Sequence, residues 1–270
     1  MLNIPIPFRR IGANGPLLLM LLRNDIKAKF RHSILGVLWL FIPPLLILLV
    51  YVYMFSFVFK MRWPDTNCAS SWGGGLFIYA GITVYSAFSD SIMGSLNLLS
   101  SRAAMLKRFP FPLELLPVSL TMTNILISGM VLWIIFFLSL ASGGRGSWTA
   151  VLYFPLIWLP YALLVTGIAW ITSALGVFFR DLGNLFGVLL LLCFFASPIL
   201  YSDQMIPEQI AWLNRWNPLS PIIGNIRGIF LQNSAPDGWG LLGSWLLGLV
   251  LFQGGFCFFQ RMRRRFADVV

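Results

Sequence analysis

The chain has 270 residues, of which 58% are hydrophobic and only 10% are charged. Because a water-soluble domain carries about 25% charged residues, this composition excludes an ordinary soluble fold and predicts that lipid surrounds most of the chain. The net charge of +10 raises the question of nucleic-acid binding, but the cations flank long apolar runs, which favours membrane orientation and contact with anionic lipid instead.

The first predicted element is an amphipathic helix at residues 17–31, which we expect to lie in the cytoplasmic membrane interface. At about 100° per residue, one narrow arc of this helix carries Leu19, Leu22, Ile26 and Phe30. The adjacent ridge, where the charge lies, consists of Arg23, Lys27 and Arg31. The helix is either a passive anchor or a surface for a cytosolic partner or an anionic lipid headgroup.

Six apolar segments are long enough to cross a bilayer as helices, since a span needs about 20 residues at about 1.5 Å each. They cover residues 34–59, 76–98, 118–141, 150–179, 182–200 and 241–259. The predicted fold class is therefore an all-α integral membrane protein in which residues 1–270 form one transmembrane domain. We expect Pro155 and Pro160 to kink the fourth span or to delay its start.

The lysines and arginines predict the orientation of these spans. When both termini are placed inside, fourteen of the 19 cations lie on the inner side. The five that remain outside are Lys60, Arg62, Arg145, Arg215 and Arg227. Since cytoplasmic loops carry the excess of positive charge, this bias predicts that both termini are cytoplasmic.

Aromatic residues form two rows in the outer half of the first span. Tyr51, Phe55 and Phe59 lie on one side of the helix, and Tyr53 and Phe57 lie roughly opposite. The rows are either an ordinary interfacial aromatic belt, or one of them lines a path for sugars, whose C–H faces pack on aromatic rings. Such a surface would suit a sliding polymer, because it demands few fixed hydrogen bonds.

Asp90, in the second span, is the most deeply placed acid of the chain. A carboxylate at that depth is costly unless it faces protein or water. We expect it either to pair with a cation on the cytoplasmic side, such as Arg31 or Arg102, or to take part in transport.

Two connections are long. The inner one, residues 100–117, carries cations followed by "FPFPLELLP", whose prolines prevent a continuous helix, so it is either a docking element or a simple connector. The outer one, residues 201–240, is apolar. Its pieces "QIAWLNRW" and "IIGNIRGIFLQ" predict two short helices that dip back toward the membrane as a lid over an exit.

The residues offer no catalytic or metal site. No G-x-x-x-x-G-K-[ST] phosphate loop occurs in the sequence, so we expect a subunit that is not itself an enzyme and takes its energy from a partner. Three cysteines, two of them inside apolar runs, and the single histidine, His32, suggest neither a disulfide framework nor a metal site.

Four segments, in order along the chain, resemble the membrane subunit of polysaccharide-exporting ABC transporters, and the O-antigen export type above all. They are "RNDIKAKFRHSILGVLWLFIPPLLILLVYVYMFSFVF", "LKRFPFPLELLP", "FFRDLGNLFGVLLLLCFFASPILY" and "NPLSPIIGNIRGIFL". The resemblance implies a type-2 ABC exporter permease in the bacterial cytoplasmic (inner) membrane. It also implies a homodimer with two cytosolic ATPase subunits, which bind ATP and Mg, so that this chain holds no cofactor and binds no nucleic acid.

The same resemblance implies roles for particular segments. A lipid-linked polysaccharide would pass from the cytoplasm to the periplasm between the first and fifth spans, along the aromatic rows. Contact with the ATPase is implied for Arg102, Lys107, Arg108 and Glu114. The short helices in 201–240, with Asn217, Pro218 and Arg227, would close the periplasmic end.

The residues are also compatible with other functions. Within polysaccharide export they are capsular polysaccharide and teichoic acid; outside it they are a drug or lipid ABC exporter and an ion-coupled carrier or channel without an ATPase. A single aspartate in a span makes proton coupling a poor explanation, because proton relays use several intramembrane acids and histidines.

Overall fold

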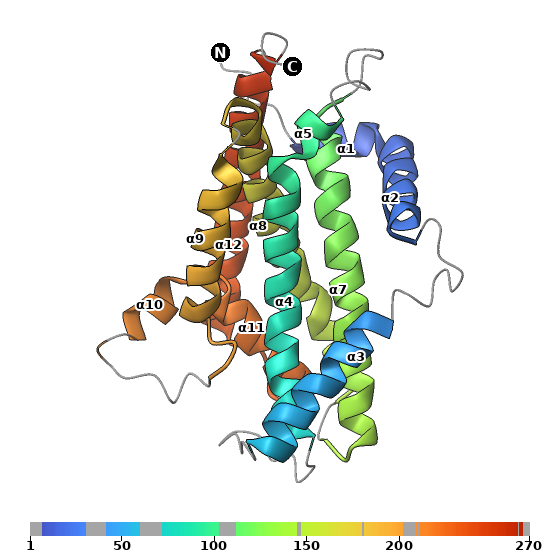
Figure 1. Cartoon of the computed structure of the whole chain (residues 1–270), viewed down its shortest axis with the longest axis vertical. Helices are drawn as coiled ribbons and strands as arrows, with labels where there is room; N and C mark the ends of the chain where they lie inside the picture. The colour runs from blue at the N-terminus through green and yellow to red at the C-terminus, as the bar shows by residue number, and fades with distance from the viewer. Residues whose placement is uncertain are drawn as a thin grey trace.

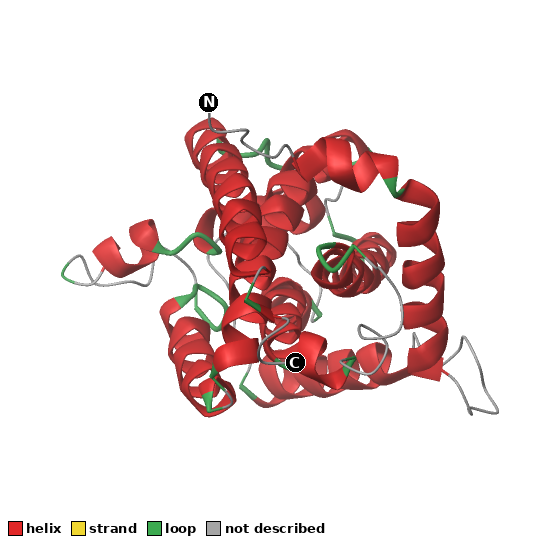
Figure 2. Ribbon diagram, turned by 90° about the horizontal axis from the view of Figure 1, so that it is seen from above, coloured by secondary structure: helices red, strands yellow, loops and turns green. Residues whose placement is uncertain are grey.

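The structure is a computed structural model that describes residues 7–30, 42–59, 72–102, 112–144, 147–179, 181–201, 209, 211–263 and 265–266. Within these residues every regular element is a helix, in agreement with the predicted all-α class. The long helices run along the long axis of the molecule (Figure 1) and form a bundle when seen along that axis (Figure 2).

Four helices of the described chain are long and apolar enough to cross a membrane: α4 (Gly73–Leu96), α7 (Leu115–Ala141), α8 (Thr149–Phe178) and α12 (Gly238–Arg263). They coincide with the second, third, fourth and sixth predicted spans. Pro155 and Pro160 lie inside α8 and do not delay its start, because a membrane helix tolerates proline where neighbouring groups compensate for the lost hydrogen bond.

The first and fifth predicted spans correspond to shorter apolar helices. α3 (Ile42–Tyr51) continues directly into the π-helix η2 (Val52–Val58), and α9 covers Leu182–Ala196. The 15 residues of α9 extend about 22 Å, which is shorter than a hydrocarbon core of about 30 Å. α3 and η2 cross α4 obliquely (Figure 1). Residues 34–41 of the first predicted span lie outside the described residues.

α8 and α12 pack against each other backbone to backbone. A Cβ atom added to Gly255 would lie 2.1 Å from the carbonyl oxygen of Gly167, and one added to Gly248 would lie 2.7 Å from that of Pro160. Small residues allow such close approach at helix contacts in membranes. The last helix of the chain is thereby held against the middle of the bundle.

α4 lies at the centre of the bundle and contacts α7, α8, α9 and η2. Polar side chains reinforce its apolar packing: the Tyr161 hydroxyl of α8 donates a 2.6 Å hydrogen bond to the carbonyl oxygen of Val84. Ser95 of α4 and Thr172 of α8 share a hydrogen bond between their hydroxyls. These bonds satisfy polar groups that have no water to contact in a membrane.

α1 (Pro7–Ala13) and α2 (Gly15–Phe30) lie at the end of the bundle that also holds α5 (Leu98–Ser101) and the last turns of α12 (Figure 1). We call this the α5 end. Leu18 and Leu21 attach α2 to the apolar cluster around Trp170, whereas Leu19 of the predicted apolar arc is 58% exposed. The packed side of the helix thus lies next to the arc expected from spacing, and Leu22 and Ile26 of that arc are half-buried.

The connection between α9 and α12 contains the two predicted short helices. They are α10 (Ala211–Trp216) and α11 (Ser220–Arg227), and the π-helix η4 (Gly228–Gln232) continues α11. Asn233 ends η4 with a φ of 54°, a left-handed conformation that asparagine adopts more readily than most residues. Ile222, Ile226 and Phe230 are fully buried, so α11 and η4 belong to the core of the bundle.

Candidate functional site

The aromatic residues of α3 and η2 divide into two environments. The Tyr51 ring stacks on Phe55 with centroids 5.9 Å apart, and it lies 5.9 Å from the ring of Tyr79 in α4. Tyr51 and Phe55 are half-buried against the main apolar cluster. Tyr51 and Phe55, two of the five residues predicted to line a channel, therefore attach α3 and η2 to α4.

The other three aromatic residues are far more exposed. The exposed fractions of Tyr53, Phe57 and Phe59 are 61%, 52% and 59%. Their positions depend on the wide turn of η2, in which the Phe59 N–H donates a 2.8 Å hydrogen bond to the Met54 carbonyl oxygen. Such π-helical turns are frequent at functional sites. We call these three exposed residues, Tyr53, Phe57 and Phe59, the outer aromatic row, although the Phe59 ring also packs on Phe55 with centroids 5.6 Å apart, as its predicted row implies.

The contact between η2 and α4 fixes which row faces outward. A Cβ atom on Gly75 would lie 2.4 Å from the Cα of Val52, so only glycine allows this crossing. The Gly75 N–H donates a 3.2 Å hydrogen bond to the Ser56 hydroxyl, and the Tyr79 hydroxyl donates one of 2.8 Å to the Pro44 carbonyl oxygen. Rotation of α3 and η2 against α4 would break these contacts.

α9 presents a second exposed surface. Leu190 is its one buried residue, and the exposed apolar residues along the helix are Leu185, Val188, Leu189, Leu191, Leu192 and Phe195. A contiguous apolar surface of this kind marks contact with lipid or with another protein surface. The predicted fifth span is thus available to neighbours over most of its length.

At the α5 end, Glu114 binds arginines from the two ends of the chain. Its carboxylate accepts a 3.3 Å hydrogen bond from Arg10 in α1 and a 3.0 Å hydrogen bond from Arg263 in α12, although its side chain is only 5% exposed. Its backbone carbonyl accepts a 2.9 Å hydrogen bond from the Trp170 indole. Glu114 therefore connects α1, α8 and α12 at the start of α7.

Asp25 of α2 makes a second polar connection at this end. Its carboxylate accepts hydrogen bonds of 2.8 Å from Arg102, directly after α5, and of 2.5 Å from the Ser119 hydroxyl in α7. Asp25 thus joins α2 to both sides of the inner connection. Arg102, an expected partner of Asp90, forms this ion pair with Asp25, while Asp90 is exposed and makes contacts of its own.

Arg102 and Glu114, two of the four residues predicted to contact an ATPase, are therefore engaged within the chain. The other two, Lys107 and Arg108, lie outside the described residues, as does Arg31 of the predicted ridge. Arg23 and Lys27 are exposed on α2, where an external anion can reach them.

Four partners in these networks were missed by reasoning from sequence: Arg10, Asp25, Ser119 and Arg263. The three ion pairs join residues that are 77 to 149 positions apart, which no local pattern encodes. The available signal was weaker: Asp25 and Glu114 are isolated acids in cation-rich segments, and an isolated acid at a membrane edge attracts a cationic partner.

Arg227, at the end of α11, is only 3% exposed and joins three parts of the fold. Its Nε donates a 2.9 Å hydrogen bond to the carbonyl oxygen of Phe77, and its terminal nitrogens donate bonds of 2.5 Å and 2.7 Å to those of Pro198 and Ile199. A Cβ atom on Gly81 would lie 2.5 Å from the guanidinium. Arg227 thus holds α11 against α4 and the segment that follows α9.

Asn217, another predicted gate residue, makes a parallel connection. Its amide donates a 2.8 Å hydrogen bond to the Ser197 hydroxyl, and its side-chain oxygen accepts one of 2.9 Å from the Leu219 N–H. The short helices are therefore tied to the end of α9 at two points, Asn217 and Arg227. Pro218 is half-buried beside them.

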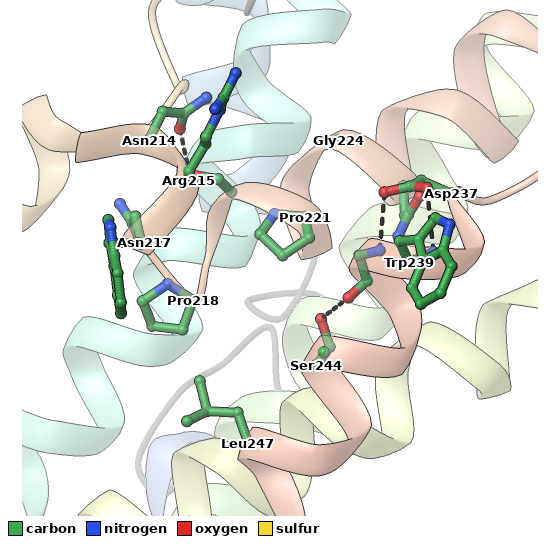
Figure 3. Close-up of a pocket in the computed structure, with 15 residues that line it drawn as sticks. Asn214, Arg215, Asn217, Pro218, Pro221, Gly224, Asp237, Trp239, Ser244 and Leu247 are labelled. Carbon is green, nitrogen blue, oxygen red and sulfur yellow. Dashed lines mark hydrogen bonds between the residues drawn. The ribbon is translucent and has the colours of Figure 1, made fainter. Parts of the chain in front are cut away.

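A cavity of about 730 Å³ opens between α10, α11 and the first turns of α12 (Figure 3). Asn217 and Pro218 line one side, and Trp239 and Leu247 belong to the α12 side. Two of the three predicted gate residues, Asn217 and Pro218, therefore border an open space that the sequence did not indicate.

Residues 16–231 match the model of a protein family described as ABC-2 type transporter. The chain is a member of the ABC-2 type transporter family. The matched region begins at α2 and ends in η4, so it includes Asp25, the outer aromatic row, Glu114 and Arg227. The resemblance drawn from the four sequence segments is confirmed at the level of this family.

Curated relatives extend over almost the whole chain. The O-antigen export system permease protein RfbA of Myxococcus xanthus is 30% identical over 94% of this chain and 95% of its own length. A protein of the same name from Klebsiella pneumoniae is 28% identical over 96% of this chain and 97% of its own length. The polysialic acid transport protein KpsM of Escherichia coli is 22% identical over 85% and 90%, respectively.

Proposed function

We propose that this chain is the channel-forming membrane subunit of an ATP-driven ABC transporter that exports lipid-linked polysaccharide of the O-antigen type from the cytoplasm to the periplasm. The observation that carries this proposal is the similarity of 28–30% identity to O-antigen export permeases over nearly the full length of both chains. The exposed aromatic residues of η2 support it, because they offer a sliding surface for sugars.

The proposed topology has six spans in the inner membrane, with both termini in the cytoplasm. α3 with η2 and α9 would supply the first and fifth spans, although both are short in the described chain. Arg10, Arg102 and Arg263 gather at the α5 end, which supports a cytoplasmic location for that end. α10 and α11 would then be the re-entrant helices of a periplasmic gate.

Two copies of the chain would enclose the channel. The exposed apolar face of α9 and the outer aromatic row of η2 need a cover, and a second copy would supply one and leave a path between the subunits. Two cytosolic ATPase subunits, which bind ATP and Mg²⁺, would contact the inner connection. Arg23 and Lys27 would meet the anionic headgroup of the lipid-linked substrate.

Coupling between ATP hydrolysis and the gate then follows from the two polar networks of the α5 end. A movement of the inner connection would displace Arg102 and Glu114, and their ion pairs would carry that movement to α1, α2 and α12. Arg227 and Asn217 tie α10 and α11 to α4 and to the end of α9. A movement of α4 or α9 would therefore reach the gate that α10 and α11 form.

Deletion of the gene tests the proposal. We expect surface O-antigen to disappear and lipid-linked polymer to accumulate inside the cell, as followed on lipopolysaccharide gels and by extraction of the cytoplasmic polymer. The wild-type gene should restore export only when the ATPase partner is present. Unchanged surface polysaccharide in the deletion strain would refute the proposal.

Capsular polysaccharide is the second candidate substrate, because the chain is also 22% identical to a polysialic acid transport protein. Selective loss of capsule, with O-antigen intact, would favour it in the same deletion strain. Teichoic acid and drug or lipid export rest on no comparable observation.

A further inference from the structure

The cavity between α10, α11 and α12 has exposed tryptophans on two of its helices. Trp216, the last residue of α10, is 82% exposed, and Trp239, in the first turn of α12, is 84% exposed. Both belong to the cavity wall. Figure 3 shows Trp239 at the start of α12 and Asn214 and Asn217 on the side of α10, so the cavity lies between an aromatic residue and two asparagines.

The lining of the cavity is mostly apolar, and its polar groups are held in place by hydrogen bonds. Ser220 donates a hydrogen bond to the side-chain oxygen of Asn214, and the Asn217 amide is bound to Ser197. Directly before α12, the Asp237 carboxylate accepts hydrogen bonds of 3.2 Å and 2.8 Å from the N–H groups of Trp239 and Gly240, which orients the turn that carries the tryptophan. The site is therefore built before a ligand arrives.

This chemistry suits a sugar better than a lipid headgroup. Aromatic faces combined with amide and hydroxyl groups match the C–H faces and hydroxyls of a pyranose ring. An anionic headgroup would require a cluster of cations, whereas Arg215 shares this wall with the carboxylate of Asp237. The volume of about 730 Å³ falls within the range of small-molecule sites.

We infer that this cavity is a glycan-binding site in which Trp216 and Trp239 stack on sugar residues of the exported polysaccharide. The inference rests on the proposed function, and it adds a site outside the outer aromatic row. A polymer held there is captured on the periplasmic side after it leaves the channel, which opposes its return.

The alternative role of these tryptophans is membrane anchoring, since tryptophan is enriched at membrane interfaces. α10 offers a matched control for this alternative. Trp212 is on the same helix and 59% exposed, yet it lies outside the described lining of the cavity. Anchoring would involve Trp212 as much as Trp216, whereas glycan binding depends on Trp216 and Trp239 alone.

Binding can be measured on the full-length chain with its ATPase in nanodiscs. The probe is the O-polysaccharide of cells that carry the transporter, released from its lipid by mild acid hydrolysis and titrated by microscale thermophoresis. We expect Trp216→Ala and Trp239→Ala each to raise the Kd about fivefold, the scale of one aromatic contact. The double variant should raise it more than tenfold, whereas Trp216→Phe and Trp212→Ala should stay within twofold of wild type.

Three results would overturn the inference: a wild-type Kd in the double variant, an equal loss in Trp212→Ala, or no binding of the polysaccharide to the wild-type protein. A fourth arm uses nanodiscs with brominated phosphatidylglycerol. The measurement is the quenching of tryptophan fluorescence by the brominated lipid. If this quenching is lost in the double variant and polysaccharide does not relieve it in the wild type, the cavity is assigned to lipid.

The glycan site and the proposed export function can be refuted independently of each other. If the double variant binds polysaccharide normally while deletion of the gene abolishes surface O-antigen, the glycan site is wrong and the proposed function stands. If deletion leaves surface polysaccharide unchanged, the proposed function itself is wrong. Should the double variant unfold, Trp216→Phe against Trp216→Ala, compared at equal folded protein, still decides the question.

Discussion

The guanidinium carbon of Arg227 lies 4.0 Å from the centre of the Phe77 ring, and its Nε donates a 2.9 Å hydrogen bond to the carbonyl oxygen of the same residue. One side chain of α11 thus binds both the ring and the backbone of a residue in α4. Planar geometry allows this combination, since an arginine can stack and donate hydrogen bonds in its plane at the same time.

Replacing Arg227 with Met should destabilise the fold by at least about 2 kcal/mol, because the buried carbonyl oxygens of Pro198 and Ile199 lose their donor at about 1–3 kcal/mol each. Arg227→Lys should recover only part of this loss, since an ammonium lacks the planar fork. Thermal unfolding in detergent measures the effect. The exposed Arg215 provides the control, and Arg215→Met should change stability by less than about 0.5 kcal/mol. Equal melting temperatures for the two variants would contradict the role of Arg227.

Glu114→Gln should lower stability by about 1–3 kcal/mol, because the buried carboxylate loses its charge-assisted bonds to Arg10 and Arg263. It should also make the N-terminal segment more sensitive to chymotrypsin, since α1 loses its ion-pair connection to α12 through Glu114. Arg10→Gln should reproduce part of both effects, and Arg9→Gln, at the exposed neighbouring position, should reproduce neither. Identical digestion of the Glu114 and Arg9 variants would show that the network does not hold α1.

Asp25 and Arg102 form a pair that a double-mutant cycle can isolate. We expect Asp25→Asn and Arg102→Gln to be non-additive by about 0.5–3 kcal/mol, the range for residues in contact. The ratio of ATP hydrolysed to polymer exported should rise equally in both single variants and no further in the double variant. A larger rise in Arg102→Gln than in Asp25→Asn would indicate that Arg102 also acts outside this pair.

The predictable features of this fold are those that local patterns encode. Length and hydropathy located α4, α7, α8 and α12 to within a few residues, because a membrane helix satisfies its backbone polar groups within its own segment. The two short helices of the outer connection followed from the apolar character of a loop that was too long to lack structure.

The remaining features depend on contacts between distant segments. Spacing predicted two aromatic rows, but which of their rings pack on α4 depends on the crossing at Gly75 and Val52. Phe59 is exposed, although Tyr51 and Phe55 of its predicted row are half-buried. The ion pairs of Glu114 similarly require α1 and α12 to meet beside α7. The cavity beside Trp216 and Trp239 exists only after α10 and α12 have been brought together, so no segment of the sequence signals it.

The two aromatic rows should respond differently to truncation. Tyr53→Ala and Phe57→Ala remove exposed rings, so we expect reduced export with a change in stability below about 0.5 kcal/mol. Tyr51→Ala and Phe55→Ala remove rings packed against the bundle, so we expect a stability loss of about 1–3 kcal/mol.

Surface polysaccharide per folded transporter is the measurement that separates the rows. Normal export in the double variant of Tyr53 and Phe57 would exclude a lining role for the outer aromatic row. Unchanged melting of Tyr51→Ala would exclude the packing role of the inner residues.

Gly254 and Gly255 are adjacent in α12 and provide a test of the α8–α12 contact. A Cβ atom on Gly255 would lie 2.1 Å from the carbonyl oxygen of Gly167, whereas one on Gly254 meets no atom within 4 Å. We expect Gly255→Ala to force the helices apart and cost about 1–3 kcal/mol, the range for overpacking. Gly254→Ala should be neutral or stabilising by up to about 1 kcal/mol, since alanine favours the helix over glycine. Equal stability of the two variants in thermal unfolding would show that α12 does not rest on α8 at Gly167, and the path from Glu114 through α12 to the bundle would lose its structural basis.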